Sequence, residues 1–148
     1  FTLTSKISSI NKKSIETTLR FIKKEYKKKI ENKKILLMGI TYKENVDDLR
    51  HSPALVLKEK LIYHGAKVFV SDIYDYNYLN SKNFNFIFNP NFNDYDIVLF
   101  CTGHDNYKKI NLKNYNKSNY FFDLNYIFSN DMIKILKSKK VKIFQLGT

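Results

Sequence analysis

The chain has 148 residues, 43% of them hydrophobic and 16% aromatic, and 26 Lys and Arg against 14 Asp and Glu give it a formal net charge of +12. This length fits one globular domain, and the apolar content excludes wholesale disorder, while no apolar run approaches the roughly 18 residues of a membrane-spanning helix. The single cysteine, Cys101, cannot form an internal disulfide, so the sequence predicts a reducing, cytoplasmic compartment and no membrane partner.

The positive charge by itself is typical of nucleic-acid-binding proteins. However, Arg20 and Arg50 are the chain's two arginines, and bidentate recognition of phosphates and bases depends on arginine. The excess is lysine, accompanied by abundant Asn, Ile, Tyr and Phe, which share A/T-rich codons. We therefore interpret the charge as a solvated lysine surface and do not expect a nucleic-acid partner.

The first predicted element is a helix over residues 12–29. Ile15, Leu19, Ile22 and Tyr26 recur in steps of four and three, which places them on one helix face, and the opposite face is almost all lysine. Because the chain begins at Phe1 with a helix and no preceding strand, we expect it to be a piece of a longer protein.

Strands and helices alternate after this helix. The apolar run 35–38, ended by Gly39, predicts a central parallel strand, and Ser52 with Pro53 predicts the start of a helix that ends at Gly65. The sequence further predicts strands at 68–71, 97–101, 120–122 and 141–146, a short helix at 106–110 and a helix at 131–138. Residues 73–94 contain one short apolar patch, 84–88. The pattern predicts an α/β, Rossmann-like three-layer domain with a mostly parallel sheet.

Ligands of such sheets bind beyond the carboxyl ends of the strands, which here are residues 39–43, 72, 102–104 and 123–126. The dinucleotide fingerprint G-x-G-x-x-G is absent, and the loop after the first strand carries Asp47 and Asp48. A nicotinamide site in this chain is therefore not expected. Two interpretations of the acidic residues stay open. Asp48 orients one or both of the cations Lys43 and Arg50, which leaves Lys43 as a candidate to meet an anionic ligand, or Asp47, Asp48 and Arg50 merely pin the loop and the first helix turn.

Four segments carry a family resemblance: G-I-T-Y-K-E-N-V-D-D-L-R-H-S-P-A, H-G-A-K-V-F-V-S-D, D-Y-D-I-V-L-F-C-T-G-H-D-N-Y and F-F-D-L-N. Together they resemble the C-terminal, nucleotide-sugar-binding domain of the UDP-glucose/GDP-mannose dehydrogenase family. The resemblance covers nearly the whole chain. It implies that residues 1–31 are the end of an interdomain connecting helix and that 32–148 form the nucleotide-sugar-binding α/β domain.

The resemblance implies an activity larger than this chain. Members of the family oxidise the C6 alcohol of a nucleotide sugar, such as UDP-glucose or a UDP-N-acetylhexosamine, to a uronic acid in two NAD-dependent steps through a nucleophilic cysteine. Their N-terminal domain binds NAD, and the cysteine precedes the C-terminal domain. We therefore expect no cofactor, no metal and no catalytic residue in this chain, and a homodimer or higher oligomer for the full-length protein, serving polysaccharide biosynthesis.

The resemblance also implies substrate-binding residues. Tyr42 and Lys43 match the aromatic–lysine pair that contacts the nucleotide sugar, whereas Asp48 and Arg50 match positions that organise the loop first and touch the ligand second. Asn125 stands where many members have an arginine that faces the nucleotide sugar, so it supplies hydrogen bonds without charge.

Two further residues are expected to be structural. His104 matches a recurrent family histidine, but a lone histidine after a strand is more often a satisfied structural group than a ligand contact. Cys101 lies in an apolar run without an activating environment and is expected to be a buried thiol rather than the nucleophile.

Two other functions stay open from the sequence. The chain is a stand-alone binding or assembly module that has the fold without the chemistry, or it is a basic nucleic-acid binder. The choice between UDP and GDP and the identity of the sugar are not determined by the sequence.

Overall fold

The computed structural model describes residues 3–112, 115 and 119–146, with side chains from residue 15 onward. Along the chain lie α1 (Leu3–Tyr26), β1 (Lys34–Met38), α2 (Pro53–Tyr63), β2 (Lys67–Ser71), the 3₁₀ helices η1 (Asn77–Lys82) and η2 (Phe92–Asp94), β3 (Ile97–Phe100), the 3₁₀ helix η3 (Asp105–Lys109), β4 (Tyr120–Asp123), α3 (Asn130–Ser138) and β5 (Lys142–Gln145). The strands form one sheet in the order β2-β1-β3-β4-β5, and every pair in it is parallel.

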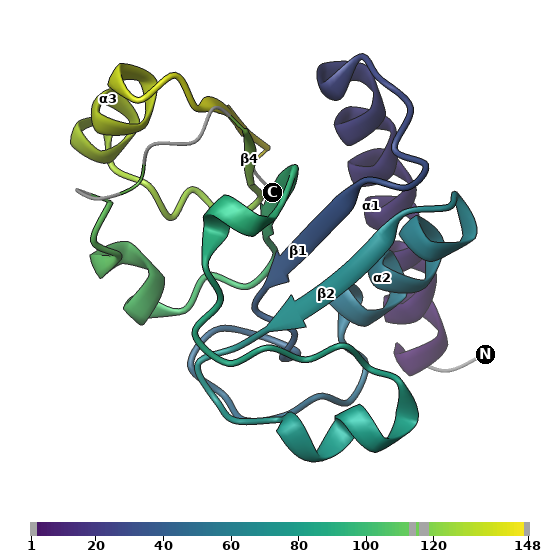
Figure 1. Cartoon of the computed structure of the whole chain (residues 1–148). Helices are drawn as coiled ribbons and strands as arrows, with labels where there is room; N and C mark the ends of the chain where they lie inside the picture. The colour runs from purple at the N-terminus through teal and green to yellow at the C-terminus, as the bar shows by residue number, and fades with distance from the viewer. Residues whose placement is uncertain (1–2, 113–114, 116–118, 147–148) are drawn as a thin grey trace.

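The alternation of side chains along each strand builds three layers. In β1, Ile35 and Leu37 belong to the same buried cluster as α1 and α2, whereas Leu36 and Met38 belong to a second cluster that includes Leu136 of α3. Figure 1 accordingly shows α1 and α2 on one side of β1 and β2 and α3 on the other. The predicted Rossmann-like, three-layer α/β fold is confirmed.

Helix α1 begins at Leu3, nine residues earlier than the lysine-rich pattern indicates, because nothing in residues 3–11 breaks a helix. Its predicted apolar stripe is confirmed, since Ile15, Leu19, Ile22 and Tyr26 are all at most 5% exposed and pack in the core with β1 and β3. At least from Ile15 onward, the helix therefore lies on the sheet rather than extending away from it.

Helix α2 begins and ends where the sequence predicts. The Ser52 hydroxyl accepts a hydrogen bond from the Leu55 N–H at 3.3 Å, Pro53 occupies the first turn, and Gly65 follows the helix at φ +90°. This capping fixes where the long loop after β1 must rejoin regular structure.

The connections from β2 to β3 and from β3 to β4 differ from the prediction. The helix predicted at 106–110 is the 3₁₀ helix η3, β3 ends at Phe100 instead of residue 101, and residues 73–94 form η1, η2 and one parallel bridge from Phe86 to Val70. A right-handed crossover normally places a full helix over the sheet. Here no α-helix is described in either connection, so the sheet face opposite α1 and α2 is thinly covered beside β1. No helix in the described part of the chain is long and apolar enough to cross a membrane.

Candidate functional site

The strand order reverses between β1 and β3, and the loops that follow these two strands meet at the carboxyl edge of the sheet. Gly39 makes this meeting possible: its φ is +91°, and a Cβ on it would lie 2.5 Å from Thr102 Cβ. A switch point of this kind is where open α/β sheets bind ligands. The 39–52 loop and residues 101–105 therefore enclose the first candidate site.

A pocket of about 170 Å³ opens between these loops and brings three of the predicted site residues together: Tyr42, Lys43 and Asn125. The rest of its lining comes from the same two loops and the start of α2, namely Thr41, Glu44, Pro53, Ala54, Cys101, Thr102 and Gly103. The ends of three strands, β1, β3 and β4, and the start of α2 thus supply one concave surface.

Lys43 is the residue of this pocket that can meet an anion. Its side chain is exposed, and its ammonium has no hydrogen-bond or ion-pair partner within the described residues. Tyr42 beside it is 43% exposed, so its ring forms an accessible wall. Asn125 donates a hydrogen bond from Nδ2 to the Phe100 carbonyl at 3.0 Å, which holds its side chain at the pocket. Their roles as ligand contacts stay predictions.

Asp48 and Arg50 do not line this pocket but bind each other. The guanidinium donates from Nε at 3.0 Å and from Nη2 at 2.9 Å to the two oxygens of the Asp48 carboxylate, and the Arg50 N–H donates a third bond at 2.9 Å. Hydrogen bonding from Arg50 lowers the pKa of the Asp48 carboxyl to about 2. The Asp48 carbonyl accepts from the Tyr42 N–H at 2.7 Å, so the pair supports the pocket loop from outside.

Asp47 also points away from the pocket, because its carboxylate accepts a hydrogen bond from the Tyr76 hydroxyl. Neither acidic residue contacts the Lys43 ammonium. Of the two open interpretations, the structure thus favours loop organisation, and it leaves Lys43 uncompensated.

A buried network that the sequence did not predict joins three strand ends beneath this loop. The Asp72 carboxylate accepts from the Ile40 N–H at 2.7 Å, and its other oxygen lies 3.1 Å from Nε2 of His104, whose side chain is fully buried. The Asn45 N–H donates to Nδ1 of the same ring at 2.9 Å. Since Nδ1 accepts, the ring proton is on Nε2, directed at Asp72 and, at 3.3 Å, at the Thr41 hydroxyl oxygen.

This network fixes the backbone that carries Lys43. The Thr41 hydroxyl donates to the Lys43 carbonyl at 2.9 Å, and His104 holds the Asn45 N–H two residues further on. His104 is thus a satisfied structural histidine that positions the loop. Asp72 and His104 were each visible as polar residues at strand ends, but their pairing requires the β2-β1-β3 adjacency.

Cys101 differs in part from its predicted burial. It lies one residue beyond β3, is half-buried and borders the pocket, while its thiol approaches the Leu99 carbonyl at 3.7 Å. Burial raises the pKa of this thiol to about 12, so it is not a thiolate at neutral pH and is not an activated nucleophile.

The loop after β1 does not fit a dinucleotide. Fourteen residues, 39–52, separate the end of β1 from the start of α2, and they include Asp47 and Asp48 in place of a glycine-rich turn. Within the described residues, no three His, Cys, Asp or Glu side chains gather where they would hold a metal ion.

Solved structures share the fold. A UDP-glucose dehydrogenase from the hyperthermophilic archaeon Pyrobaculum islandicum aligns with a TM-score of 0.67 at 16% identity, covering 94% of this chain and 30% of its own. An NDP-N-acetyl-D-galactosaminuronic acid dehydrogenase from Methanosarcina mazei Go1 aligns with a TM-score of 0.62 at 17% identity, covering 90% of this chain and 28% of its own.

Sequence comparison goes further than fold. A UDP-N-acetyl-D-mannosamine dehydrogenase from Methanocaldococcus jannaschii is 38% identical to this chain over 87 residues. The aligned segment covers 59% of this chain and 19% of that protein's length. Residues 36–130 match the model of the UDP-glucose/GDP-mannose dehydrogenase family, UDP binding domain. These residues include the pocket loop, the His104 network and Asn125. The chain therefore belongs to the UDP-glucose/GDP-mannose dehydrogenase family and carries its UDP-binding domain.

Proposed function

We propose that this chain is the nucleotide-sugar-binding part of an NAD-dependent dehydrogenase that oxidises the C6 alcohol of UDP-glucose or of a UDP-N-acetylhexosamine to a uronic acid. The observation that carries the proposal is the Lys43 ammonium, which has no partner in the part of the chain that the structure describes, at a pocket on the switch point of a UDP-binding domain. Residues 1–31 are the end of the helix that connects it to the rest of the protein, and 32–148 are the binding domain.

In this proposal the chain supplies binding and no chemistry. Lys43 places a mobile cation against the diphosphate, Tyr42 provides an aromatic wall, and Asn125 contributes hydrogen bonding without charge. Asp48 and Arg50 act first through the loop, and Arg50, whose side chain is 84% exposed, reaches a ligand only by giving up its ion pair with Asp48.

Catalysis belongs to the remainder of the longer protein, because the matched relative is about five times longer than the aligned segment. NAD, the hydride acceptor, binds in that remainder of the protein and not in this chain, because the loop after β1 lacks a glycine-rich turn that would hold its phosphates. The nucleophilic cysteine also lies outside, since the pKa of Cys101 is raised to about 12. The full-length protein is a cytoplasmic homodimer or larger assembly that contributes to polysaccharide synthesis.

Titration of the 148-residue chain with UDP, GDP and UDP-sugars, followed by amide chemical shifts, tests the binding role. Removing a charge-assisted hydrogen bond costs about 1.5–3 kcal/mol, so Lys43→Ala should weaken UDP binding at least roughly tenfold. Lys67→Ala is the matched control, because Lys67 is an exposed lysine at the opposite end of β2.

Equal affinity of Lys43→Ala and the parent for UDP would contradict the site assignment. A steady-state assay with NAD and UDP-glucose should show no NADH formation by the chain alone. Turnover would refute the claim that chemistry lies elsewhere, and salt-sensitive binding to polynucleotides with no response to UDP-sugars would instead support the nucleic-acid alternative.

A further inference from the structure

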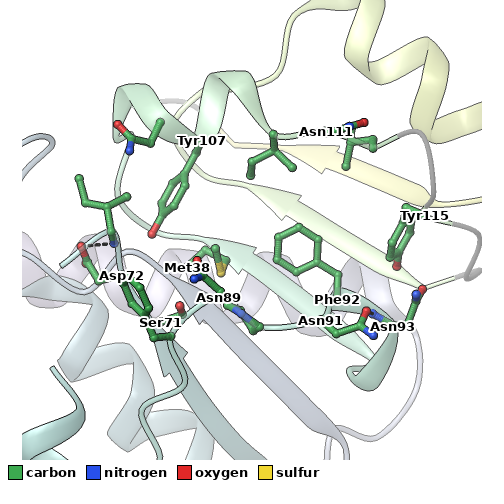
Figure 2. Close-up of a pocket in the computed structure, with 16 residues that line it drawn as sticks. Met38, Ser71, Asp72, Asn89, Asn91, Phe92, Asn93, Tyr107, Asn111 and Tyr115 are labelled. Atoms are coloured by element: carbon green, nitrogen blue, oxygen red, sulfur yellow. Dashed lines mark hydrogen bonds between the residues drawn. The ribbon is translucent and has the colours of Figure 1, made fainter. Parts of the chain in front are cut away.

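A second and larger pocket, of about 660 Å³, lies on the sheet face opposite α1 and α2 (Figure 2). Met38 at the end of β1 and Ser71 at the end of β2 line it from the sheet side, and residues 88–93, 106–107, 110–112 and 115 line its other sides. It occupies the place where the β2-to-β3 and β3-to-β4 connections have 3₁₀ turns instead of helices. Its volume lies in the range of small-molecule sites.

Two buried hydroxyls in the lining have no hydrogen-bond partner among the described residues. Ser71 is 1% exposed and Tyr107 is 4% exposed, and neither the Ser71 Oγ nor the Tyr107 hydroxyl has a hydrogen bond to any part of the chain that the structure describes. Figure 2 shows the Tyr107 ring reaching from the segment above the pocket toward Met38 and Ser71. Buried polar groups are nearly always paired, because leaving one unpaired costs free energy.

The charge of the described lining residues favours an uncharged ligand. None of the described lining residues is Lys, Arg or His. Asp72 borders the pocket, but its oxygens already accept from the N–H groups of Ile40 and Ile73, each at 2.7 Å, and from the His104 ring. Among the described lining residues no cation offsets the Asp72 carboxylate, so these residues do not attract a phosphate or carboxylate ligand.

The lining offers both a surface for stacking and groups for hydrogen bonding. Met38, Phe92 and Tyr115 supply apolar or aromatic surface, and five asparagines, at positions 89, 91, 93, 106 and 111, supply amides. A planar heterocycle can bury its two apolar faces on this surface while its edge meets the amides, whereas a sugar carries hydroxyls on both faces. Burial raises the pKa of the Tyr107 hydroxyl, so this group keeps its proton and can donate.

We infer that this pocket binds an uncharged, planar, hydrogen-bonding heterocycle, of which nucleosides are the representative class, with the Tyr107 and Ser71 hydroxyls as its polar anchors. This site is distinct from the Lys43 pocket. His104 contacts Thr41, which lines the Lys43 pocket, and Asp72, which lines the larger one, so their network forms the wall between the two pockets.

Adenosine and uridine, with N-acetylglucosamine as the polyol comparison, are titrated into the 148-residue chain and followed by amide chemical shifts. We expect one nucleoside to bind per chain, with shifts around Ser71 and Tyr107 and none from the sugar. Loss of one neutral hydrogen bond should make Tyr107→Phe and Ser71→Ala each bind about fivefold more weakly. Tyr63→Phe, at a residue that is 88% exposed, is the matched control and should bind like the parent.

The thermal unfolding midpoint without nucleoside gives an independent check. Because each substitution removes an unpaired buried hydroxyl, Tyr107→Phe and Ser71→Ala should keep or raise the midpoint. A lowered midpoint would show that the hydroxyl has a structural partner, and it would overturn the inference.

The inference is also overturned if neither nucleoside shifts any resonance at about 10 mM, because a specific site would bind at lower concentrations. Binding of the sugar in place of the nucleosides would overturn it as well. UDP affinity should be unchanged in Tyr107→Phe. If Tyr107→Phe weakened UDP and uridine equally, there would be one site rather than two, whereas failure of Lys43→Ala to weaken UDP binding bears only on the proposed function.

Discussion

Replacing Asp72 by asparagine tests the network that joins β1, β2 and β3. The carboxylate has no exposed side-chain surface, and it accepts from the N–H groups of Ile40 at 2.7 Å, Ile73 at 2.7 Å and Tyr74 at 3.3 Å as well as from the His104 ring at 3.1 Å. Asparagine has the same shape, but it keeps one acceptor oxygen and replaces the other by an N–H₂ donor.

The amide must therefore turn its N–H₂ group toward a backbone N–H. If the oxygen stays with Ile73, Tyr74 and His104, the Ile40 N–H loses its acceptor, which costs about 1–3 kcal/mol. The remaining bonds become neutral and weaker, but the cost of burying a charge disappears, and these two changes largely offset each other. We therefore expect Asp72→Asn to lower the free energy of unfolding by about 2 kcal/mol, the middle of the range for losing the acceptor of the Ile40 N–H.

Urea unfolding followed by far-ultraviolet circular dichroism measures this difference. With a slope of about 2 kcal/mol per molar urea, the midpoint should fall by about 1 M. Asp75→Asn is the matched control, because Asp75 is exposed and accepts one hydrogen bond, from the Asn77 N–H at 2.9 Å, which asparagine can also accept. The control should change the unfolding free energy by less than about 0.5 kcal/mol. Equal midpoints for the two variants would refute the role assigned to Asp72.

Two further predictions concern the loop after β1. Gly39→Ala should abolish stable folding, because its Cβ would lie 2.5 Å from a neighbouring side-chain carbon at φ +91°, whereas Gly103→Ala, with its nearest contact at 3.4 Å, should fold with a midpoint close to that of the parent. The Asp48 carboxyl should titrate at about 2 in a carboxyl-carbon NMR titration, because Arg50 donates hydrogen bonds to it. Since its pKa in the folded state is below the ordinary value of about 4, its contribution to stability is present above pH 4 and is lost as the pH falls toward 2. In Arg50→Ala the carboxyl should titrate near 4, and a parent value near 4 would contradict the ion pair.

The regular elements were readable from local patterns in the sequence. Ile15, Leu19 and Ile22 indicated the buried face of α1, and Ser52 with Gly65 indicated the ends of α2, because period and capping act within a few residues. The motif around Tyr42 and Lys43 also predicted a ligand-binding loop, and that role stays a prediction. These features depend on neighbours along the chain, and the sequence contains them in full.

The partners of the polar residues depended on tertiary structure. Asp72 and His104 are 32 residues apart in the chain, and they pair because β2 and β3 flank β1 in the sheet, so that their ends lie near one another. Nothing local in the sequence specifies that strand order. Likewise, the second pocket follows from 3₁₀ turns in place of helices, which leave the Ser71 and Tyr107 hydroxyls facing one space. Sequence alone determined the helices and strands whose patterns are local, but not the 3₁₀ helices of the two connections. Only the strand order, by bringing distant strand ends together, decided which polar groups meet and where two pockets open.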